Sequence, residues 1–259
     1  MIALLLAVCM TTLTFTACEG SDSADQPTGI PPTVARSSTR APAASHRIDV
    51  DYISQREDYP CGCESVSAVM ALRYAGYEYD VDSFIDRFLP TGADPYYEND
   101  GLLHAESPYD VFIGSPYSDY SYGCYAPVIR VALEAALSDA YGGDEINAES
   151  GSIPVSVRDL TGASLESLCR DYIDRDIPVI VWGTIGMQPI RALTEWVLPD
   201  GSLFTWKSQE HCLLLVGYDA SYYYFNDPME GKDTAYPKAD AENAYSELYS
   251  QAIAIVPNA

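Results

Sequence analysis

Apolar residues recur at helical spacing in four segments of the chain. The strongest covers residues 63–75, where Val66, Met70 and Tyr74 are four positions apart and Gly76 follows as a stop signal. The same pattern, with starting serines or a following proline, predicts three more helices over residues 81–89, 126–140 and 164–174. The first two thirds of the chain therefore reads as mainly helical.

Short, continuous apolar runs bounded by polar residues follow, as in buried strands. They predict strands over residues 178–183, 202–206, 211–218, 222–226 and 252–256. Asp219, Ala220 and Ser221 are predicted to join two of these strands as a tight hairpin. Helices first and an antiparallel sheet afterwards indicate an α+β domain in two lobes, with a cleft between the lobes as the natural place for a site.

Residues 91–123 fit neither pattern and are rich in Tyr, Asp, Gly and Pro. An irregular segment of this length is unusual inside a compact domain, and such segments often form part of a binding surface. Its role is not predicted by the sequence.

The chain begins with an uncharged apolar run over residues 2–17 that is too short to span a bilayer. Its end, Phe15-Thr16-Ala17-Cys18, resembles the lipobox of bacterial lipoprotein signals, in which the cysteine becomes lipidated. We therefore expect a signal peptide at 1–17 and a lipid anchor at Cys18. An ordinary signal peptide with an incidental cysteine is the alternative, and both predict an exported, extracytoplasmic protein.

Residues 18–45 are rich in Ser, Thr, Ala, Pro and Asp and carry few large apolar residues. Such a stretch cannot form a core, so it is predicted to be a flexible tether. The remaining residues, 46–259, are enough for one domain with a substantial core.

Charge narrows the set of partners. The 259 residues carry 38 acidic and 14 basic side chains, a formal net charge of -24. This balance disfavours nucleic acid and the surface of an anionic membrane, so we expect membrane contact only through the lipid at Cys18. A peptide or protein substrate, including a cationic one, remains compatible with it.

Only three histidines are present, and one stands out. His46 ends the tether and His104 lies in the irregular segment, whereas His211 opens a predicted strand. Side chains alternate along a strand, so His211 can face a cleft at the end of the strand while its neighbours enter the core.

Among the cysteines of the domain, Cys63 has the position of a nucleophile. It follows Gly62 and opens the strongest helix, where unpaired backbone N–H groups and the helix dipole favour a thiolate. Cys61 lies in the preceding loop without that advantage, while Cys169 and Cys212 fit buried apolar positions. A disulfide between Cys61 and another cysteine, Cys124, is conceivable in an exported protein.

Two further residues complete a candidate acyl-transfer site. Asp227 ends the strand that returns from His211, so its carboxylate could orient the imidazole; an Asn-Asp-Pro turn without a partner is the alternative. Gln55 could donate an amide N–H to a developing oxyanion, although glutamine in a loop is more often polar surface.

Taken in order, these residues resemble cysteine peptidase family 39. The resemblance rests on Gln55, on Tyr59-Pro-Cys-Gly-Cys63-Glu-Ser, on Glu210-His-Cys and on Tyr224-Phe-Asn-Asp-Pro228, and it extends from about Ile48 to Val256. The best-known members cut double-glycine leaders from bacteriocin precursors; this chain is similar to the stand-alone secreted branch. The resemblance implies a papain-like fold without a cofactor, with Cys63 as nucleophile, His211 as base, Asp227 as orienting group and Gln55 in the oxyanion hole.

Two other functions fit parts of the sequence. The fold could serve as a non-enzymatic module that binds a peptide or glycan through the Tyr-rich segment. Alternatively, Cys61, Cys63, His211 and Cys212 could form a metal or redox site, although zinc sites more often use Cys-x2-Cys spacing.

Overall fold

The computed structural model describes residues 44–142 and 154–258. The predicted signal peptide, Cys18 and most of the tether lie outside these residues. In the described part, no helix is both long and apolar enough to cross a bilayer.

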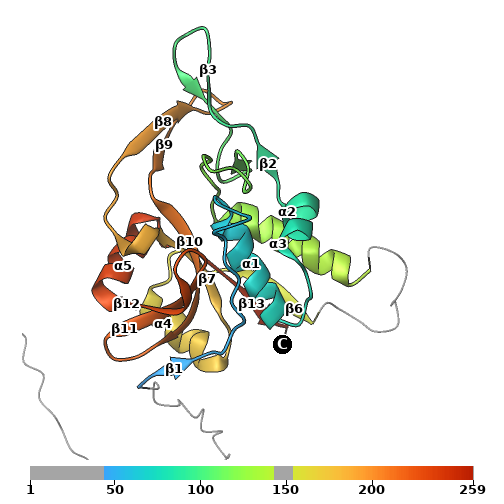
Figure 1. Cartoon of the computed structure of the whole chain (residues 1–259), viewed down its shortest axis with the longest axis vertical. Coiled ribbons are helices and arrows are strands. Elements are labelled where there is room, and N and C mark those ends of the chain that lie inside the picture. Colours follow the sequence, from blue (N-terminus) through green and yellow to red (C-terminus); the bar gives the residue numbers. More distant parts are fainter. Residues whose placement is uncertain (1–43, 143–153, 259) are drawn as a thin grey trace, which may run out of the picture. The chain divides into compact units, whose positions relative to one another are not determined.

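An antiparallel sheet with strands of unequal length forms the centre of the fold (Figure 1). Among the described residues it has seven strands in the order β12-β11-β10-β7-β13-β6, and β1 also pairs with β10. The strands are β1 (His46–Arg47), β6 (Val155–Asp159), β7 (Val179–Thr184), β10 (Glu210–Tyr218), β11 (Tyr222–Asp227), β12 (Gly231–Pro237) and β13 (Ala252–Pro257).

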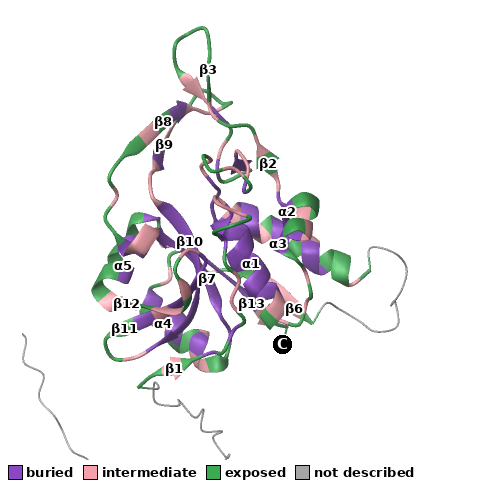
Figure 2. Ribbon diagram, in the orientation of Figure 1, coloured by how far each residue is buried: buried purple, intermediate pink, exposed green. Residues whose placement is uncertain are grey.

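Strand β10 is buried along its whole length because both of its edges and both of its faces are covered. It pairs with β7 on one edge and with β11 and β1 on the other. All nine of its residues are buried, as Figure 2 shows for the centre of the sheet. The strand predicted over 211–218 is confirmed, and its unbroken apolar run reflects its central position.

Three helices from the first part of the chain pack together: α1 (Cys63–Tyr74), α2 (Val81–Phe88) and α3 (Ala126–Ala140). Helix α1 also packs against β10 and β7. Its residues from Cys63 to Leu72 are all buried, so α1 is a core helix, without the solvent-exposed face of a surface helix. It ends before Gly76, which adopts a φ of 93° that favours glycine.

Two more helices accompany the strands. Helix α4 (Leu165–Asp171) begins after Ser164, whose side chain accepts a hydrogen bond from the Ser167 N–H, and a 3-10 turn at Ile173–Arg175 follows. The predicted helix over 164–174 is therefore two pieces. Helix α5 (Lys238–Glu247) packs against β7, β11 and β12.

The segment 91–123 was expected to be irregular, and the structure corrects this. It contains the short strands β2 (Thr91–Gly92), β3 (Tyr96–Tyr97), β4 (Leu103–His104) and β5 (Phe112–Ile113). Strand β4 pairs with β8 (Leu193–Val197), and β3, β4, β8 and β9 (Leu203–Lys207) form a second sheet, seen at the top of Figure 1.

The fold class is the predicted one, an antiparallel-sheet α+β architecture of the papain-like kind. All predicted helices and strands are present, with ends shifted by a few residues. The elements not predicted are β6, β8, β12, α5 and the two-residue strands. Strand β12 lies at a sheet edge and is partly exposed, so it lacks the apolar run that marks a buried strand.

The central position of β10 predicts a large cost for a cavity there. Leu214→Ala removes a fully buried side chain and should lower the free energy of unfolding by about 2–5 kcal/mol. Leu193→Ala is the matched control, because Leu193 is 61% exposed, and should change it by less than about 0.5 kcal/mol. Urea unfolding followed by tryptophan fluorescence measures both values, and equal effects would contradict the burial of Leu214 at the centre of the sheet.

Candidate active site

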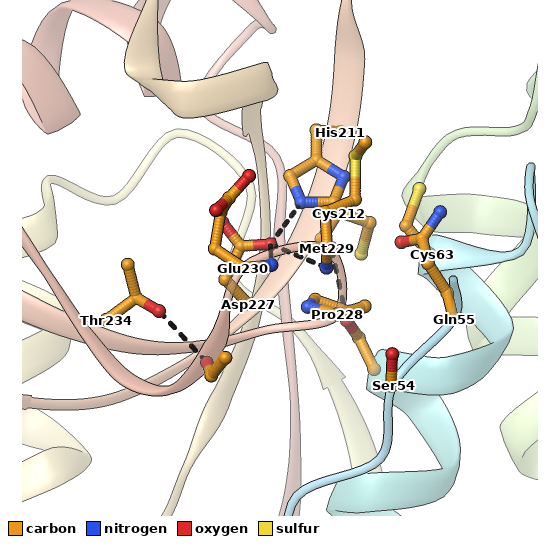
Figure 3. A network of polar contacts seen from close by, with 12 residues as sticks. Ser54, Gln55, Cys63, His211, Cys212, Asp227, Pro228, Met229, Glu230 and Thr234 are labelled. Carbon is orange, nitrogen blue, oxygen red and sulfur yellow. Dashed lines mark hydrogen bonds and ion pairs between the residues drawn. The ribbon is translucent and has the colours of Figure 1, made fainter. Parts of the chain in front are cut away.

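The site is built around His211, which lies near the start of β10. The pairing of Leu214 with Asn226 places Asp227 diagonally across from His211 on the same face of the sheet. His211 Nε2 and Asp227 Oδ1 are 2.7 Å apart, and each side chain is only 1% exposed. The predicted pairing of these two residues therefore exists as a buried contact (Figure 3).

Asp227 is held by more than the histidine. Its Oδ2 accepts a hydrogen bond of 2.6 Å from the Tyr236 hydroxyl, and its Oδ1 accepts one of 2.9 Å from the Met229 N–H. Burial alone would raise the pKa of Asp227, but the hydrogen bond and charge of His211 and these other donors lower it below its ordinary value. The carboxyl group is therefore ionised.

Ionisation of Asp227 fixes the histidine tautomer. A carboxylate only accepts hydrogen bonds, so the proton between the two side chains belongs to Nε2 of His211. In the neutral ring Nδ1 is then an acceptor. Figure 3 shows this second ring nitrogen on the side of His211 that faces Cys63.

Cys63 is the first residue of α1, as the sequence predicts. The chain turns into this helix at Gly62, whose N–H donates to the Tyr59 carbonyl over 2.9 Å. A Cβ at Gly62 would lie 2.8 Å from Tyr59 Cβ, closer than carbon atoms pack, so this turn requires glycine. The Cys63 side chain is 6% exposed.

The predicted site residues meet at one cavity of about 400 Å³. Gln55, Cys63 and His211 line it directly, and Asp227 lies behind His211. The Tyr-rich segment supplies one wall through Asp119, Ser121 and Tyr122. The second sheet and the turn after it supply another through Thr194, Trp206, Ser208 and Gln209, and Glu210 lines the cavity from the start of β10. A larger cavity of about 660 Å³ on the second sheet contains none of the predicted residues.

Gln55 is positioned beside Cys63 (Figure 3) and is 3% exposed. Its amide Nε2 donates to the Pro60 carbonyl over 2.9 Å. An amide nitrogen carries two hydrogens, so this bond leaves one for another acceptor. Burial with a backbone anchor distinguishes Gln55 from a polar surface residue.

The protonation state of Cys63 differs from the sequence expectation. The helix start predicted a thiolate, yet burial, followed by the charges of Glu64 and Glu210, raises the pKa of Cys63 well above its ordinary value. The thiol is therefore neutral at rest. Its Sγ–H donates to Glu64 Oε2 over 3.3 Å.

Glu64 and Glu210 belong to the motifs that carry the family resemblance, but the sequence interpretation gave them no role in the site. Glu64 is fully buried, its Oε1 accepts a 2.7 Å bond from the Cys124 N–H, and burial raises its pKa to about 7. Glu210 is 8% exposed, and burial together with the Glu64 charge raises its pKa. The available signal was an acidic residue next to apolar positions: Glu64 stands within the core helix, and Glu210 stands just before the apolar run of β10.

The remaining cysteines form no bridge in the described part of the chain. Cys61, Cys63, Cys124, Cys169 and Cys212 are all free thiols, so the conceivable bridge between Cys61 and Cys124 is not formed. Cys169 and Cys212 are buried, as predicted.

The predicted metal or redox set is not assembled either. Its members Cys61, His211 and Cys212 are absent from the potential ligand groups that the described residues bring together within 4.8 Å, and only its Cys63 belongs to one.

Comparison with known proteins identifies the family of this chain. Residues 47–253 match the model of the Peptidase_C39 like family. The chain belongs to this family. YvpB of Bacillus subtilis strain 168, an uncharacterized protein, is 28% identical over 195 residues, which cover 75% of this chain and 68% of YvpB.

A solved structure supports the same assignment at the level of the fold. The crystal structure of a Bacillus anthracis protein assigned as a C39-like peptidase matches with a TM-score of 0.68 and 26% identity. The match covers 83% of this chain and 98% of that one. The C39-like peptidase recognised from the sequence is thus confirmed in family and fold.

The raised pKa of Glu64 predicts a stability that falls as the pH rises. The carboxyl ionises near 4.5 in the unfolded chain and near 7 in the folded one, so between these values the folded state holds the extra proton. The contribution of Glu64 to the free energy of unfolding should be fully present below pH 4.5 and should fall by about 1–3 kcal/mol as the pH rises through 7. Urea unfolding between pH 4 and 8 gives the slope.

Glu64→Gln should make the fall of the unfolding free energy with pH shallower by about 1 kcal/mol per pH unit. The matched control is Glu134→Gln on the exposed face of α3, which should leave the wild-type slope unchanged. A wild-type slope in Glu64→Gln would contradict the raised pKa of Glu64.

Proposed function

We propose that this chain is a cysteine peptidase in which Cys63 is the nucleophile and His211 the base. The observation that carries the proposal is the shared cavity: the thiol and the imidazole border the same space, and a buried carboxylate fixes the ring with Nδ1 as acceptor. A nucleophile, a base and a group that orients the base are the parts required for acyl transfer.

In the first half of the reaction, Sγ of Cys63 attacks the carbonyl carbon of the scissile bond while Nδ1 of His211 takes the thiol proton. The carbonyl oxygen becomes an oxyanion, held by the second amide hydrogen of Gln55 and by the backbone N–H of Cys63 at the start of α1. Collapse of this intermediate breaks the C–N bond, and the imidazolium gives its proton to the leaving amine. A thioester on Cys63 remains.

In the second half, a water molecule replaces the amine. Nδ1 of His211 takes a proton from the water, whose oxygen attacks the thioester carbonyl. The C–S bond then breaks, the proton returns to sulfur, and the carboxylic acid product leaves. Asp227 stays ionised throughout and stabilises the charged imidazolium in both halves.

The neutral resting thiol determines the timing of the first step. Burial, followed by the charges of Glu64 and Glu210, raises the pKa of Cys63, so in this proposal the proton moves to His211 during the attack. A base that receives this proton is therefore essential, and in this proposal it is Nδ1 of His211, whose ring borders the same cavity as the thiol.

The substrate we propose is a peptide, as the family implies. Asp119 adds negative charge to the cavity, and Tyr122 and Trp206 add aromatic surface. Such walls favour a peptide with basic and apolar side chains near the cleaved bond.

We also propose export of the protein and attachment to the membrane by a lipid on Cys18. This part rests on the sequence alone, through the lipobox-like Phe15-Thr16-Ala17-Cys18 and the polar tether behind it. The peptidase would then act outside the cytoplasmic membrane.

A non-enzymatic binding module on the same fold is the second candidate. The observation that favours it is the raised pKa of the Cys63 thiol, which a binding protein has no need to lower. Such a module would use the cavity and the Tyr-rich wall to hold a peptide without cleaving it.

Substitution of the thiol separates the two candidates. Cys63→Ala should lower kcat/KM for a cleaved peptide by at least about 10³-fold, because the nucleophile is lost. Cys61→Ala, which removes the neighbouring sulfur, should stay within about tenfold of wild type. Hydrolysis that survives Cys63→Ala ends the peptidase proposal, whereas peptide binding without hydrolysis in the wild type supports the binding module.

The orienting carboxylate gives a second test. Asp227→Asn keeps the size of the side chain but removes the charge that holds the histidine tautomer, so kcat should fall by about 10²–10⁴-fold. Asp219→Asn, in the exposed turn between β10 and β11, is the matched control and should keep wild-type kcat. Steady-state kinetics measures both, and an Asp227→Asn enzyme of full activity would refute the assigned role.

A further inference from the structure

One cluster beside the cavity has the composition of a metal site. Cys63, Glu64 and Glu210 each offer a ligand atom, and these atoms all lie within 4.8 Å of one another. The set consists of one sulfur and two carboxylates from two elements, the start of α1 and the start of β10. All three side chains are buried.

Glu210 brings an observation that points to a ligand. It is 8% exposed and lines the cavity, and its Oε1 has no hydrogen-bond partner among the described residues. A buried carboxylate oxygen without a donor is costly, and a bound cation would satisfy it.

The surroundings supply no fixed positive charge for this purpose. None of the residues that line the cavity is a lysine or an arginine. The two carboxyl oxygens of Glu64 have different partners. Oε1 accepts a hydrogen bond from the Cys124 N–H, and Oε2 accepts one from the Cys63 thiol. The arrangement therefore holds two carboxylates at one thiol, and the basic side chain that lines the same cavity is the imidazole of His211.

Backbone packing keeps the two carboxylates close together. Gly123 has a φ of 130°, and a Cβ there would lie 2.5 Å from Glu64 Oε1 and 3.0 Å from Glu210 Oε2. Only glycine lets the chain pass this close to both side chains.

We propose that Cys63, Glu64 and Glu210 form a site for a zinc ion. Sγ of Cys63, Oε2 of Glu64 and one carboxylate oxygen of Glu210 would be three ligands, and a water molecule from the cavity the fourth. Binding releases the thiol proton and any proton held by the carboxyl pair, so the bound sulfur is a thiolate.

The donor set selects among cations. A thiolate disfavours Mg²⁺ and Ca²⁺, which prefer oxygen ligands only, whereas zinc accepts sulfur together with carboxylates. A second group of potential ligands, Glu98, Asp100 and His104, is exposed or half-buried and contains a His104–Asp100 ion pair. This exposed group supplies the control variants for the test.

Occupancy of this site would inhibit the enzyme. Zinc bound to the sulfur would withdraw electron density from it and occupy the space that the scissile carbonyl must enter, so zinc would act as a reversible inhibitor. This consequence rests on the proposed peptidase function, whereas metal binding itself does not. A binding measurement therefore separates failure of the metal site from failure of the peptidase proposal.

The experiment is a titration of the full, reduced chain with Co²⁺, which substitutes for zinc and gives a sulfur-to-cobalt charge-transfer absorption. Wild type should show this band and lose it when Zn²⁺ is added. Cys63→Ser should lack the band. Glu210→Gln, of nearly unchanged volume, should retain the sulfur but weaken zinc binding, measured by competition with a chromophoric chelator, by at least about tenfold.

Matched variants decide the location. Glu98→Gln and His104→Ala, in the exposed group, should leave both the absorption band and the zinc affinity at wild-type values. Circular dichroism of each variant establishes that it is folded, and thermal unfolding of Glu210→Gln with and without zinc gives a second readout. An unchanged band in Cys63→Ser, or unchanged affinity in a folded Glu210→Gln, would overturn the proposal.

Discussion

The contact between helix α1 and strand β10 is the constraint on which the site depends. Ser67 lies one helical turn after Cys63, and its hydroxyl donates to the Cys212 carbonyl over 3.2 Å, next to His211. The small side chains of α1 let the helix approach the strand closely. The positions of the sulfur and the imidazole are therefore set by the core of the domain, because both belong to elements that are buried on every side.

Local patterns in the sequence predicted the parts of the fold that the core contains. The helix at Cys63 and the strand at His211 carry apolar runs that only burial explains, and both were predicted close to their observed ends. Strand β12 and helix α5 were not predicted, since their residues are partly polar and their structure depends on neighbours distant in sequence. The short strands within residues 91–123 pair mainly with one another, β2 with β5 and β3 with β4, and at two residues each they are too short to leave a periodic pattern in the sequence.

The candidate site was predicted in its residues but not in its electrostatics. Gln55, Cys63, His211 and Asp227 could be chosen from residue type, position and family resemblance. The charge around the thiol could not, because it depends on Glu64 and Glu210 meeting in space from positions 146 residues apart. A helix start favours a thiolate, yet burial of the sulfur, followed by the charges of Glu64 and Glu210, raises the pKa of Cys63 above its ordinary value.

Asp227 contacts the candidate base and also stabilises a backbone turn. Besides His211, it receives the backbone N–H groups of Met229 and Glu230 and so shapes the turn between β11 and β12. A relative that had lost its chemistry would still need this side chain for its turn. The aspartate alone is thus a poor marker of activity in this family, and the informative pair is the sulfur and the imidazole, whose retention the turn does not require.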